Sequence, residues 1–296
     1  TATPVWLTGE LNAPNGHWQY QGGVSAETLE MSAPPQLLKL GKLAAQISAN
    51  AEKLQVNGSF SPSTVPGKFS FALDHNLSNG EGQLSMLPLQ AIDLSGDSNK
   101  LSQLVTPWVY PFDLLTGTIK LWSQATWSPQ RAFRLTAKIK MDDGGGTLAK
   151  ELVFSGLTIE HELELLPKLQ SRRTGNIDLK HLDSGVTSSN ISVHVALKAA
   201  STGALPQLDI QGLHGEILGG TFSADDFIFD LNKNKNRFKL NATNIDLAEI
   251  AETQQLESLK VTGRVDGTIP IEINEQGVVI EHGALINDVH AGTIRY

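Results

Sequence analysis

The amino-acid sequence predicts a mainly β protein, an elongated and curved antiparallel β-sheet with a few short helices. Apolar and polar residues alternate strictly from Leu259 to Ile273, which places the apolar side chains on one face of an extended strand. Two further segments, Leu54 to Leu73 and Ile119 to Met141, alternate in the same way on both sides of a turn. Glycine followed by threonine and an apolar residue recurs along the chain, and glycines inside strands mark bulges or bends.

The N-terminal part of the chain predicts strands around one helix. Thr1 to Leu29 has the composition of two short strands around a turn at Ala13 to Gly16. After two prolines, the apolar residues of Gln36 to Glu52 recur at spacings of three and four, which predicts an amphipathic helix. Leu54 to Leu73 then forms a hairpin around the SPSTVPG turn.

The middle of the chain predicts a strand, a short helix and a long hairpin. Leu84 to Leu94 alternates as a strand that Pro88 interrupts, since proline belongs at an edge or a bend. A short helix begins at Ser98, and Pro107 ends it. The hairpin from Ile119 to Met141 turns at the SPQR sequence and has strands of about ten residues, longer than the usual five or six.

The second half repeats this strand pattern up to Tyr296. The lysines and asparagines of Asn232 to Arg237 predict a solvated hairpin tip. Asp246 followed by Glu249 resembles a capping box and predicts a short helix, which leads into the strand from Leu259 to Ile273. Pro270 within that strand cannot donate a hydrogen bond to a neighbour and predicts an edge or a bulge.

Composition and charge exclude several classes of function. A net charge of −8 and a pI near 5.5 argue against a nucleic-acid partner. Cysteine is absent, so the chain has neither disulfides nor a cysteine-based site. No apolar run reaches membrane-spanning length, and no signal peptide or initiator methionine is present. We therefore expect a piece of a longer protein, with any anchor or targeting signal lying outside this sequence.

The sequence holds no motif of catalysis, and we expect no catalytic residues, no metal and no cofactor. The usual hydrolase, nucleotide-binding and metalloprotease motifs are missing. His161 lies beside Glu162 and Glu164, but on a strand these carboxylates point away from the imidazole. Asp142 and Asp143 before glycine predict a hairpin turn, because the spaced ligands of a calcium loop are lacking.

The apolar face is the remaining candidate for function, and two interpretations stay open on the alternation alone. The face packs against a second sheet in a closed sandwich, as in a structural or adhesive module. Alternatively, the curled sheet leaves part of the face open as a groove. Exposing one Val, Leu or Ile forfeits roughly 1.5–3 kcal/mol, so an open groove would be filled, and acyl chains suit it because each buried methylene contributes about 0.8 kcal/mol.

An ordered set of motifs in the C-terminal part resembles a known family. The set comprises Leu208 to Ile210, Ile217 to Gly220, Ile245 to Leu247, Gly263 to Ile271, Gly277 to Ile280, His282 to Leu285 and Gly292 to Tyr296. It is similar to the C-terminal domain, once labelled a dicarboxylate transport domain, of the bacterial YdbH-like proteins, which are grouped with the AsmA-like proteins TamB and YhdP. The resemblance is strongest over residues 175–296, within a chain that we expect to form a single elongated fragment.

The resemblance implies a taco-shaped β-groove in the periplasm that moves phospholipids between the inner and outer membranes of Gram-negative bacteria. It further implies an inner-membrane anchor outside this sequence, and a small outer-membrane lipoprotein that extends the groove by strand addition. The expected partners of the groove are phospholipid acyl chains. Its expected lining comprises Phe69, Phe71, Ile119, Leu121, Leu135, Ile139, Val193, Val195, Val261, Val265, Ile269, Ile271, Ile273, Val278 and Ile280. Gly219, Gly220, Gly267, Gly292 and Pro270 are expected to bend the sheet.

One substitution is expected to separate the two interpretations of the face. An aspartate at Val265 or Ile271 would unfold a closed core, at a cost of several kcal/mol. In an open groove the same aspartate would leave folding largely intact and would block lipid passage.

Overall fold

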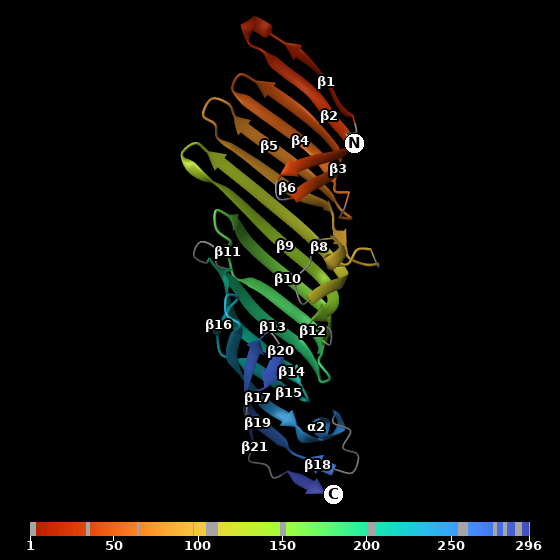
Figure 1. The fold of residues 1–296 in the computed structure, drawn as a ribbon, viewed down its shortest axis with the longest axis vertical. Coiled ribbons are helices and arrows are strands. Elements are labelled where there is room, and N and C mark those ends of the chain that lie inside the picture. Colours follow the sequence, from red (N-terminus) through yellow and green to blue (C-terminus); the bar gives the residue numbers. More distant parts are fainter. Residues whose placement is uncertain are drawn as a thin grey trace. The chain divides into compact units, whose positions relative to one another are not determined.

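The computed structural model describes residues 4–33, 36–63, 65–96, 98–104, 112–148, 152–199, 205–253, 260–274, 277–280, 283–287 and 292–295. Most of the strands join one large, open and curved antiparallel sheet, which confirms the predicted fold class (Figure 1). Successive strands of the chain are mostly neighbours in this sheet. Its connections are therefore mostly short turns.

The chain divides into two compact units, and the first comprises Thr1–Trp108, Leu115–Met141 and Glu162–Lys168. Figure 1 shows its strands side by side in chain order. Its elements are β1 (Val5–Asn12), the 3-10 turn η1 (Pro14–Gly16), β2 (Gln19–Ala33), β3 (Gln36–Asn50), β4 (Lys53–Ser61), β5 (Lys68–Asn76), β6 (Gly82–Gln90), β7 (Ile92–Asp93), α1 (Leu101–Leu104), most of β8 (Phe112–Ser128) and the first part of β9 (Arg131–Leu148).

The second unit contains the remaining strands and the longer helix. It begins with parts of β8, β9 and β10 (Leu152–Leu166). The other elements are β11 (Gln170–Ser171), β12 (Gly175–Asp183), β13 (Thr187–Lys198), β14 (Gln207–Ile217), β15 (Gly220–Ala224), β16 (Phe227–Asp230), β17 (Lys235–Asp246), α2 (Leu247–Thr253), β18 (Lys260–Thr262), β19 (Arg264–Asn274), β20 (Gly277–Ile280), β21 (Ala284–Asn287) and β22 (Thr293–Arg295).

The predicted helix at Gln36 to Glu52 is wrong, because this segment forms strand β3 and pairs with β2 and β4 along its length. The apolar residues of the sequence fall at even positions before Gly41 and at odd positions after it. Gly41 has a φ of +60° and lies opposite Leu29, where the β2–β3 register shifts. A bulge that changes the phase of alternation by one residue therefore produced the helix-like spacing.

The single strand expected from Leu259 to Ile273 is also wrong. Gly263 has a φ of +120°, a backbone conformation that favours glycine, and it ends β18 before β19 begins. Strand β18 pairs with β22 in a separate two-stranded sheet. Strand β19 joins the large sheet, and its pairings with β20 and β21 stop on either side of Pro270, which has no N–H to donate.

The predicted hairpin turn at Asp142 and Asp143 is wrong, because both residues lie inside β9, where Asp143 has a φ of +53°. Several other local predictions are confirmed. The hairpins at Leu54 to Leu73 and Ile119 to Met141 are β4–β5 and β8–β9. The turn at Ala13 to Gly16 contains η1, and the two short predicted helices are α1 and α2. Asp246 accepts a hydrogen bond from the backbone N–H of Ala248 at 2.8 Å, as expected for a residue that caps α2.

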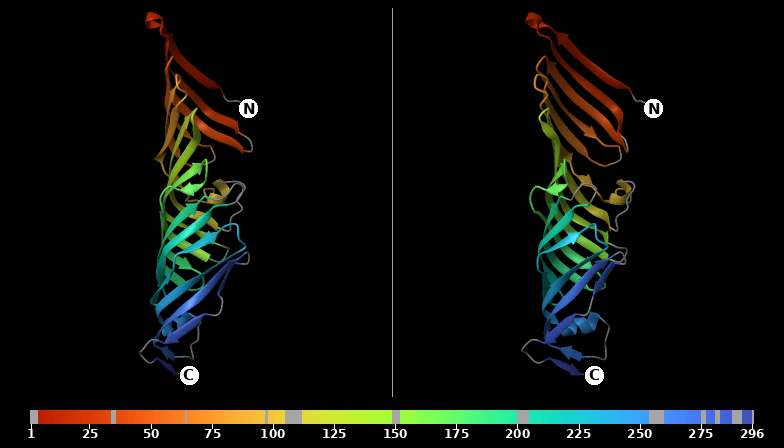
Figure 2. Two further views of the ribbon diagram at one scale, coloured as in Figure 1. Left: turned by 90° about the vertical axis from the view of Figure 1, so that its left-hand side faces the viewer. Right: turned by 60° about the vertical axis from the view of Figure 1, so that its left-hand side comes forward.

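Helix α2 closes a small core at one end of the second unit. Ala242, Ile245 and Val265 are buried there, and Leu247 and Ile250 of α2 pack against them together with Ile217, Leu218 and Ile269. Figure 2 shows α2 beside β18 and β19. This part of the apolar face is therefore covered by the chain itself.

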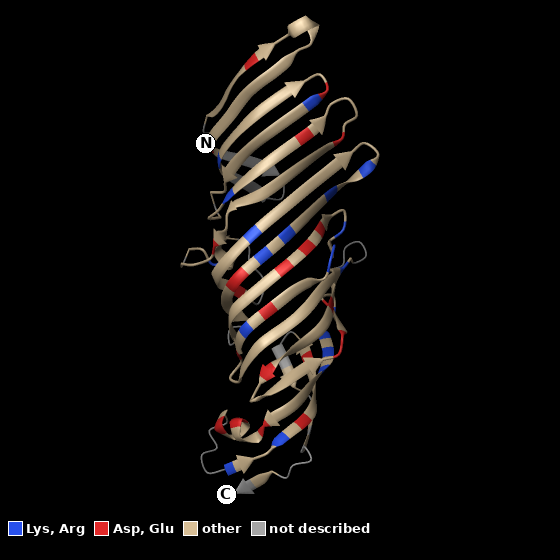
Figure 3. Ribbon diagram, turned by 180° about the vertical axis from the view of Figure 1, so that it is seen from behind, with Lys and Arg blue, Asp and Glu red and all other residues tan. Residues whose placement is uncertain are grey.

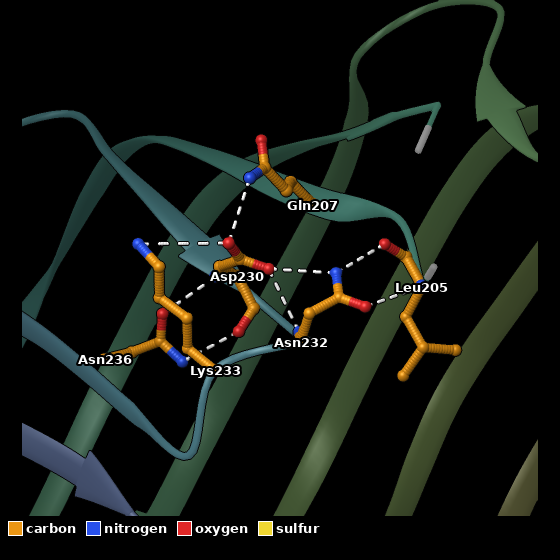
Figure 4. A network of polar contacts seen from close by, with 6 residues as sticks. All are labelled: Leu205, Gln207, Asp230, Asn232, Lys233 and Asn236. Atoms are coloured by element: carbon orange, nitrogen blue, oxygen red, sulfur yellow. Dashed lines mark hydrogen bonds and ion pairs between the residues drawn. The ribbon is translucent and has the colours of Figure 1, made fainter. Parts of the chain in front are cut away.

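A buried polar network ties the β16–β17 turn to the start of β14 (Figure 4). Asp230 is 8% exposed and accepts hydrogen bonds from the Gln207 side chain at 3.0 Å and from the Asn232 backbone N–H at 3.0 Å. The Asn232 side chain in turn bonds the backbone N–H and C=O of Leu205, each at 2.8 Å. These bonds lower the pKa of Asp230 and keep the carboxylate charged.

Ion pairs join neighbouring strands on the charged parts of the sheet, where Figure 3 shows Lys and Arg next to Asp and Glu. Within the first unit, Arg134 Nε lies 3.3 Å from Glu164 Oε1. Within the second, Lys198 Nζ lies 2.8 Å from Asp209 Oδ2. Because the basic partners are exposed, each such pair contributes little, at most about 1 kcal/mol.

We predict that Ile245→Ala lowers the free energy of unfolding by about 2–4 kcal/mol, because it leaves a cavity in the core beneath α2. Urea denaturation followed by tryptophan fluorescence and circular dichroism measures this change. Ile286→Ala is the matched control, since Ile286 is 70% exposed and its truncation should change stability by less than about 0.5 kcal/mol. Equal losses in the two variants would contradict the assignment of this core.

A second prediction concerns Glu272 of β19, which is 5% exposed and lies opposite Arg237 of β17. Hydrogen bonds from Asn274, Arg237 and Lys235 lower the pKa of this carboxyl from 4.5 to about 2. A lowered pKa stabilises the fold above pH 4.5, and this contribution is lost as the pH falls from 4.5 towards 2. The stability difference between wild type and Glu272→Gln should therefore shrink over this window in urea titrations. The same difference for the exposed Glu10→Gln should stay small throughout, and a constant difference for Glu272→Gln would refute the prediction.

Candidate functional site

The candidate site is the apolar face of the sheet, and cross-strand register makes it continuous in the first unit. Residues directly opposite one another on paired strands share a face. One row contains Leu7, Val24, Ala45, Gly58, Phe71 and Met86. The neighbouring row, two residues closer to the C-terminal end of β1, contains Gly9, Gly22, Ile47, Val56, Leu73, Leu84 and Ala125. A third apolar row lies on the same face, two residues closer to the N-terminal end of β1 than the first row. It contains Val5, Ala26, Leu43, Phe60, Phe69 and Pro88.

The opposite face of the same strands is polar. A typical row there contains Glu10, Gln21, Ser48, Gln55, Asp74, Gln83 and Thr126. Lys53 Nζ lies 2.8 Å from Asp74 Oδ2, and the Gln55 amide donates to the same oxygen at 3.1 Å. These bonds, led by the one from Lys53, lower the pKa of Asp74. The two faces therefore differ sharply in chemistry over the whole first unit.

The apolar face of the first unit is incompletely buried. Val56, Phe71 and Leu73 are half-buried, and Leu7 is 65% exposed. Among the described residues these strands pair only within the large open sheet, and no second sheet pairs with them. This arrangement does not favour the closed sandwich, in which such side chains would be fully buried.

Aromatic rings fill the face where the backbone leaves room. Phe60 and Phe69 stack with their ring centroids 5.3 Å apart, and Phe71 lies 6.2 Å from Phe60. A side chain at Gly58 would collide with the Phe71 ring, at 2.8 Å from its Cζ atom. Glycine at this position therefore lets the ring lie across the neighbouring strand.

The second unit carries an equivalent apolar face. Ile177 lies opposite Val193, and Val195 lies opposite Ile210. Further along the sheet, the rings of Phe227 and Phe238 stack with centroids 4.3 Å apart. Exposure rises again at β20, where Ile280 is 68% exposed.

Fourteen of the fifteen predicted lining residues lie on strands of the large sheet, and Val261 lies instead on β18, opposite Ile294. Ile271 pairs with Ile280, and Ile273 with Val278. Val265 and Ile271 are only 5% and 6% exposed, so an aspartate there would destabilise the fold whether the face is open or closed. The proposed test of the face therefore needs more exposed positions.

The glycines expected to bend the sheet lie in different settings. Gly219 is in the two-residue turn between β14 and β15, where both Leu218 and Gly219 have positive φ values, as a tight hairpin requires. Gly267 lies inside β19, opposite Ala242 and next to a register shift. Gly220 begins β15, and Gly292 packs against Gly263 beside the small sheet.

His161 is a buried polar group of the second unit, and its setting is structural. Its Nε2 atom lies 2.7 Å from Ser171 Oγ, which accepts a hydrogen bond from the Leu197 backbone N–H at 2.7 Å. The ring packs against Gly175, where a side chain would collide with it. Burial lowers the pKa of His161, which favours the neutral imidazole. Among the described residues, no His, Cys, Asp and Glu side chains cluster as metal ligands do.

Sequence reasoning missed the part of the face on β1 to β3. Leu43, Ala45, Ile47 and Ala49 alternate within the segment that was assigned to a helix, and this alternation was the signal available. Val5, Leu7 and Leu11 alternate in the same way in β1.

None of the described helices is long and apolar enough to span a membrane. Searches of curated proteins and of solved structures found no match to this chain. A family model described as YdbH-like, intermembrane phospholipid transport protein YdbH, matches residues 7–296. The match extends well beyond the C-terminal part in which the sequence motifs were found. The chain therefore belongs to the YdbH-like family of intermembrane phospholipid transport proteins.

Proposed function

We propose that the apolar face of the sheet binds the acyl chains of phospholipids in transit between the inner and outer membranes. The observation that carries this proposal is the continuous, half-exposed apolar face of β1 to β8 in the open sheet. Membership of a phospholipid transport family supports the same ligand. It also favours a transport protein over an enzyme.

The energetics of the face suit an acyl chain. Val56, Leu73 and Leu84 are each left partly exposed, which forfeits part of the roughly 1.5–3 kcal/mol that full burial of such a side chain provides. An acyl chain recovers this free energy and contributes about 0.8 kcal/mol for each of its own buried methylenes. It needs no polar partner, and the three apolar rows offer almost none.

We further propose that the lining includes the predicted residues on the large sheet, from Phe69 and Phe71 in β5 to Ile271 and Ile273 in β19. The family resemblance supports a periplasmic location and an inner-membrane anchor outside this sequence. It also supports a small outer-membrane lipoprotein that adds a strand to the sheet, since unpaired strand edges accept such additions.

We predict that Leu84→Asp abolishes phospholipid binding while the sheet stays folded. Leu84 is 36% exposed on the apolar face, so its replacement disturbs folding less than a charge at a buried position would. Lipid extraction and native mass spectrometry of protein purified from cells count the bound phospholipids, and circular dichroism checks the fold.

Ser85→Asp is the matched control, because the neighbouring side chain on the same strand points to the polar face. This variant should retain the wild-type amount of phospholipid. Loss of phospholipid from both variants, or from neither, would refute the proposed ligand surface.

A further inference from the structure

One row of the apolar face in the first unit differs from the others in carrying polar atoms. We call it the rim row, because it lies nearest the turns that follow β1, β3, β5 and β8. Register places seven residues in it: Leu11, Tyr20, Ala49, Leu54, His75, Gly82 and Trp127. Three of them, Tyr20, His75 and Trp127, combine a flat apolar ring with a hydrogen-bonding atom.

The three rings of the rim row lie against glycines or against one another. A side chain at Gly22 or at Gly9 would collide with the Tyr20 ring, so this ring lies across both. A side chain at Gly82 would collide in the same way with the Trp127 indole. The Trp127 indole N–H donates to His75 Nδ1 at 3.2 Å, and Phe133 stacks on Trp127 with centroids 6.4 Å apart.

The three rows that follow the rim row contain almost no polar side chains. All nineteen residues listed for these rows above are apolar or glycine. Ser123, which lies opposite Met86 and extends the middle row onto β8, is polar. Polarity on this face is therefore confined mainly to one edge. Tryptophan and tyrosine gather in the same way at the boundary between lipid tails and water, because their rings suit both environments.

We propose that the rim row holds the glycerol–phosphate region of a bound phospholipid, with its acyl chains lying along the strands towards the opposite strand ends. This proposal rests on the proposed function and adds an orientation for the ligand. It also assigns Tyr20, His75 and Trp127 as positioning residues at the boundary between headgroup and tails.

The length of the strands fits this orientation. Six residues separate His75 in the rim row from Phe69 in the last apolar row, a span of about 20 Å at roughly 3.3 Å per residue. The tails of one leaflet fill about 15 Å, half the thickness of a bilayer core. The opposite strand ends adjoin β7 and the segment after it, where Leu94 is fully buried. The rim row is therefore the end at which a polar headgroup can reach water.

Unpartnered donors lie just beyond the rim row. A hollow of about 770 Å³ reaches around the same strand tips from the rim row to the polar face. Its lining includes Gly82 and Trp127 of the rim row, Asp74, Gln83 and Thr126 of the polar face, and Asn76, Glu81, Ser128, Arg131 and Arg134. Arg131 is exposed, and its side chain has no ion pair or hydrogen bond with any described residue. Ser128 Oγ is buried without a partner in this part of the chain. The exposed Arg131 guanidinium complements the anionic phosphate diester that all glycerophospholipids share.

Fluorescence quenching in single-tryptophan variants tests the orientation. One variant keeps only Trp127, and the matched control keeps only Trp122, which lies on the polar face of the same strand near Lys138. Each is loaded from vesicles with phosphatidylcholine that carries a nitroxide either on the headgroup or near the end of one acyl chain. The amount of bound lipid is measured in the same samples by extraction.

The proposal predicts a larger loss of Trp127 emission with the headgroup nitroxide than with the chain-end nitroxide, and little loss of Trp122 emission with either. Equal or stronger quenching of Trp127 by the chain-end label would overturn the orientation while leaving lipid binding intact. Absence of bound lipid from both variants and from wild type would instead overturn the proposed function, and the rim with it.

A charge substitution tests the contact with phosphate independently. Arg131→Gln should lower the amount of headgroup-labelled lipid that remains bound through washing at low salt, whereas Lys120→Gln makes the same change of charge on the polar face away from the hollow and should not. Similar losses in both variants would indicate a general charge effect and would remove Arg131 from the site.

Discussion

The register of antiparallel strand pairing is the constraint on which the rest of the structure depends. Side chains alternate between faces every residue, so an apolar surface that crosses seven strands exists only if every pair keeps the same phase. The pairings from β1 to β8 do so over the four rows of the first unit. A slip of one residue in any pair would place serine and glutamine in the middle of the apolar face.

A single-layer sheet buries its apolar side chains poorly, and the chain compensates locally. The largest fully buried side chains are Leu94 and Met141, while most residues of the apolar rows are half-buried. Helix α2 covers only the face near Ile245 and Val265. On the polar face, cross-strand contacts such as Arg237 with Glu272 hold neighbouring strands in register. We propose that the ligand covers the apolar side chains that the protein itself leaves exposed.

The fold class could be predicted because alternation is a local property of sequence, and hairpins such as β8–β9 need only a short turn. The sequence did not reveal where alternation changes phase. The bulge at Gly41 gave the apolar residues of β3 a helical spacing, and only pairing with β2 and β4 settles the segment as a strand. Gly263 fits the alternating sequence pattern equally well, although its positive φ interrupts the strand and separates β18 from β19.

The lining of the face was predictable for the same reason, since parity within a strand decides the face. Burial was not predictable, because it depends on what covers each position. Val265 lies beneath α2 and Ile280 lies open, although the sequence treats both as lining residues. The rim row was equally hidden, because Tyr20, His75 and Trp127 are far apart in the sequence. They fall in one row only through the five successive pairings that join β2 to β8.

The central claim is that one face of the sheet carries phospholipid, and a photo-crosslinking scan along β5 tests it most directly. A photoreactive amino acid is placed in turn at Ser70, Phe71, Ala72 and Leu73, and lipid adducts formed in living cells are detected by mass spectrometry. The account predicts adducts at Phe71 and Leu73 and none at Ser70 and Ala72, a period of two residues. Adducts at all four positions, or at none while the protein remains folded, would contradict it.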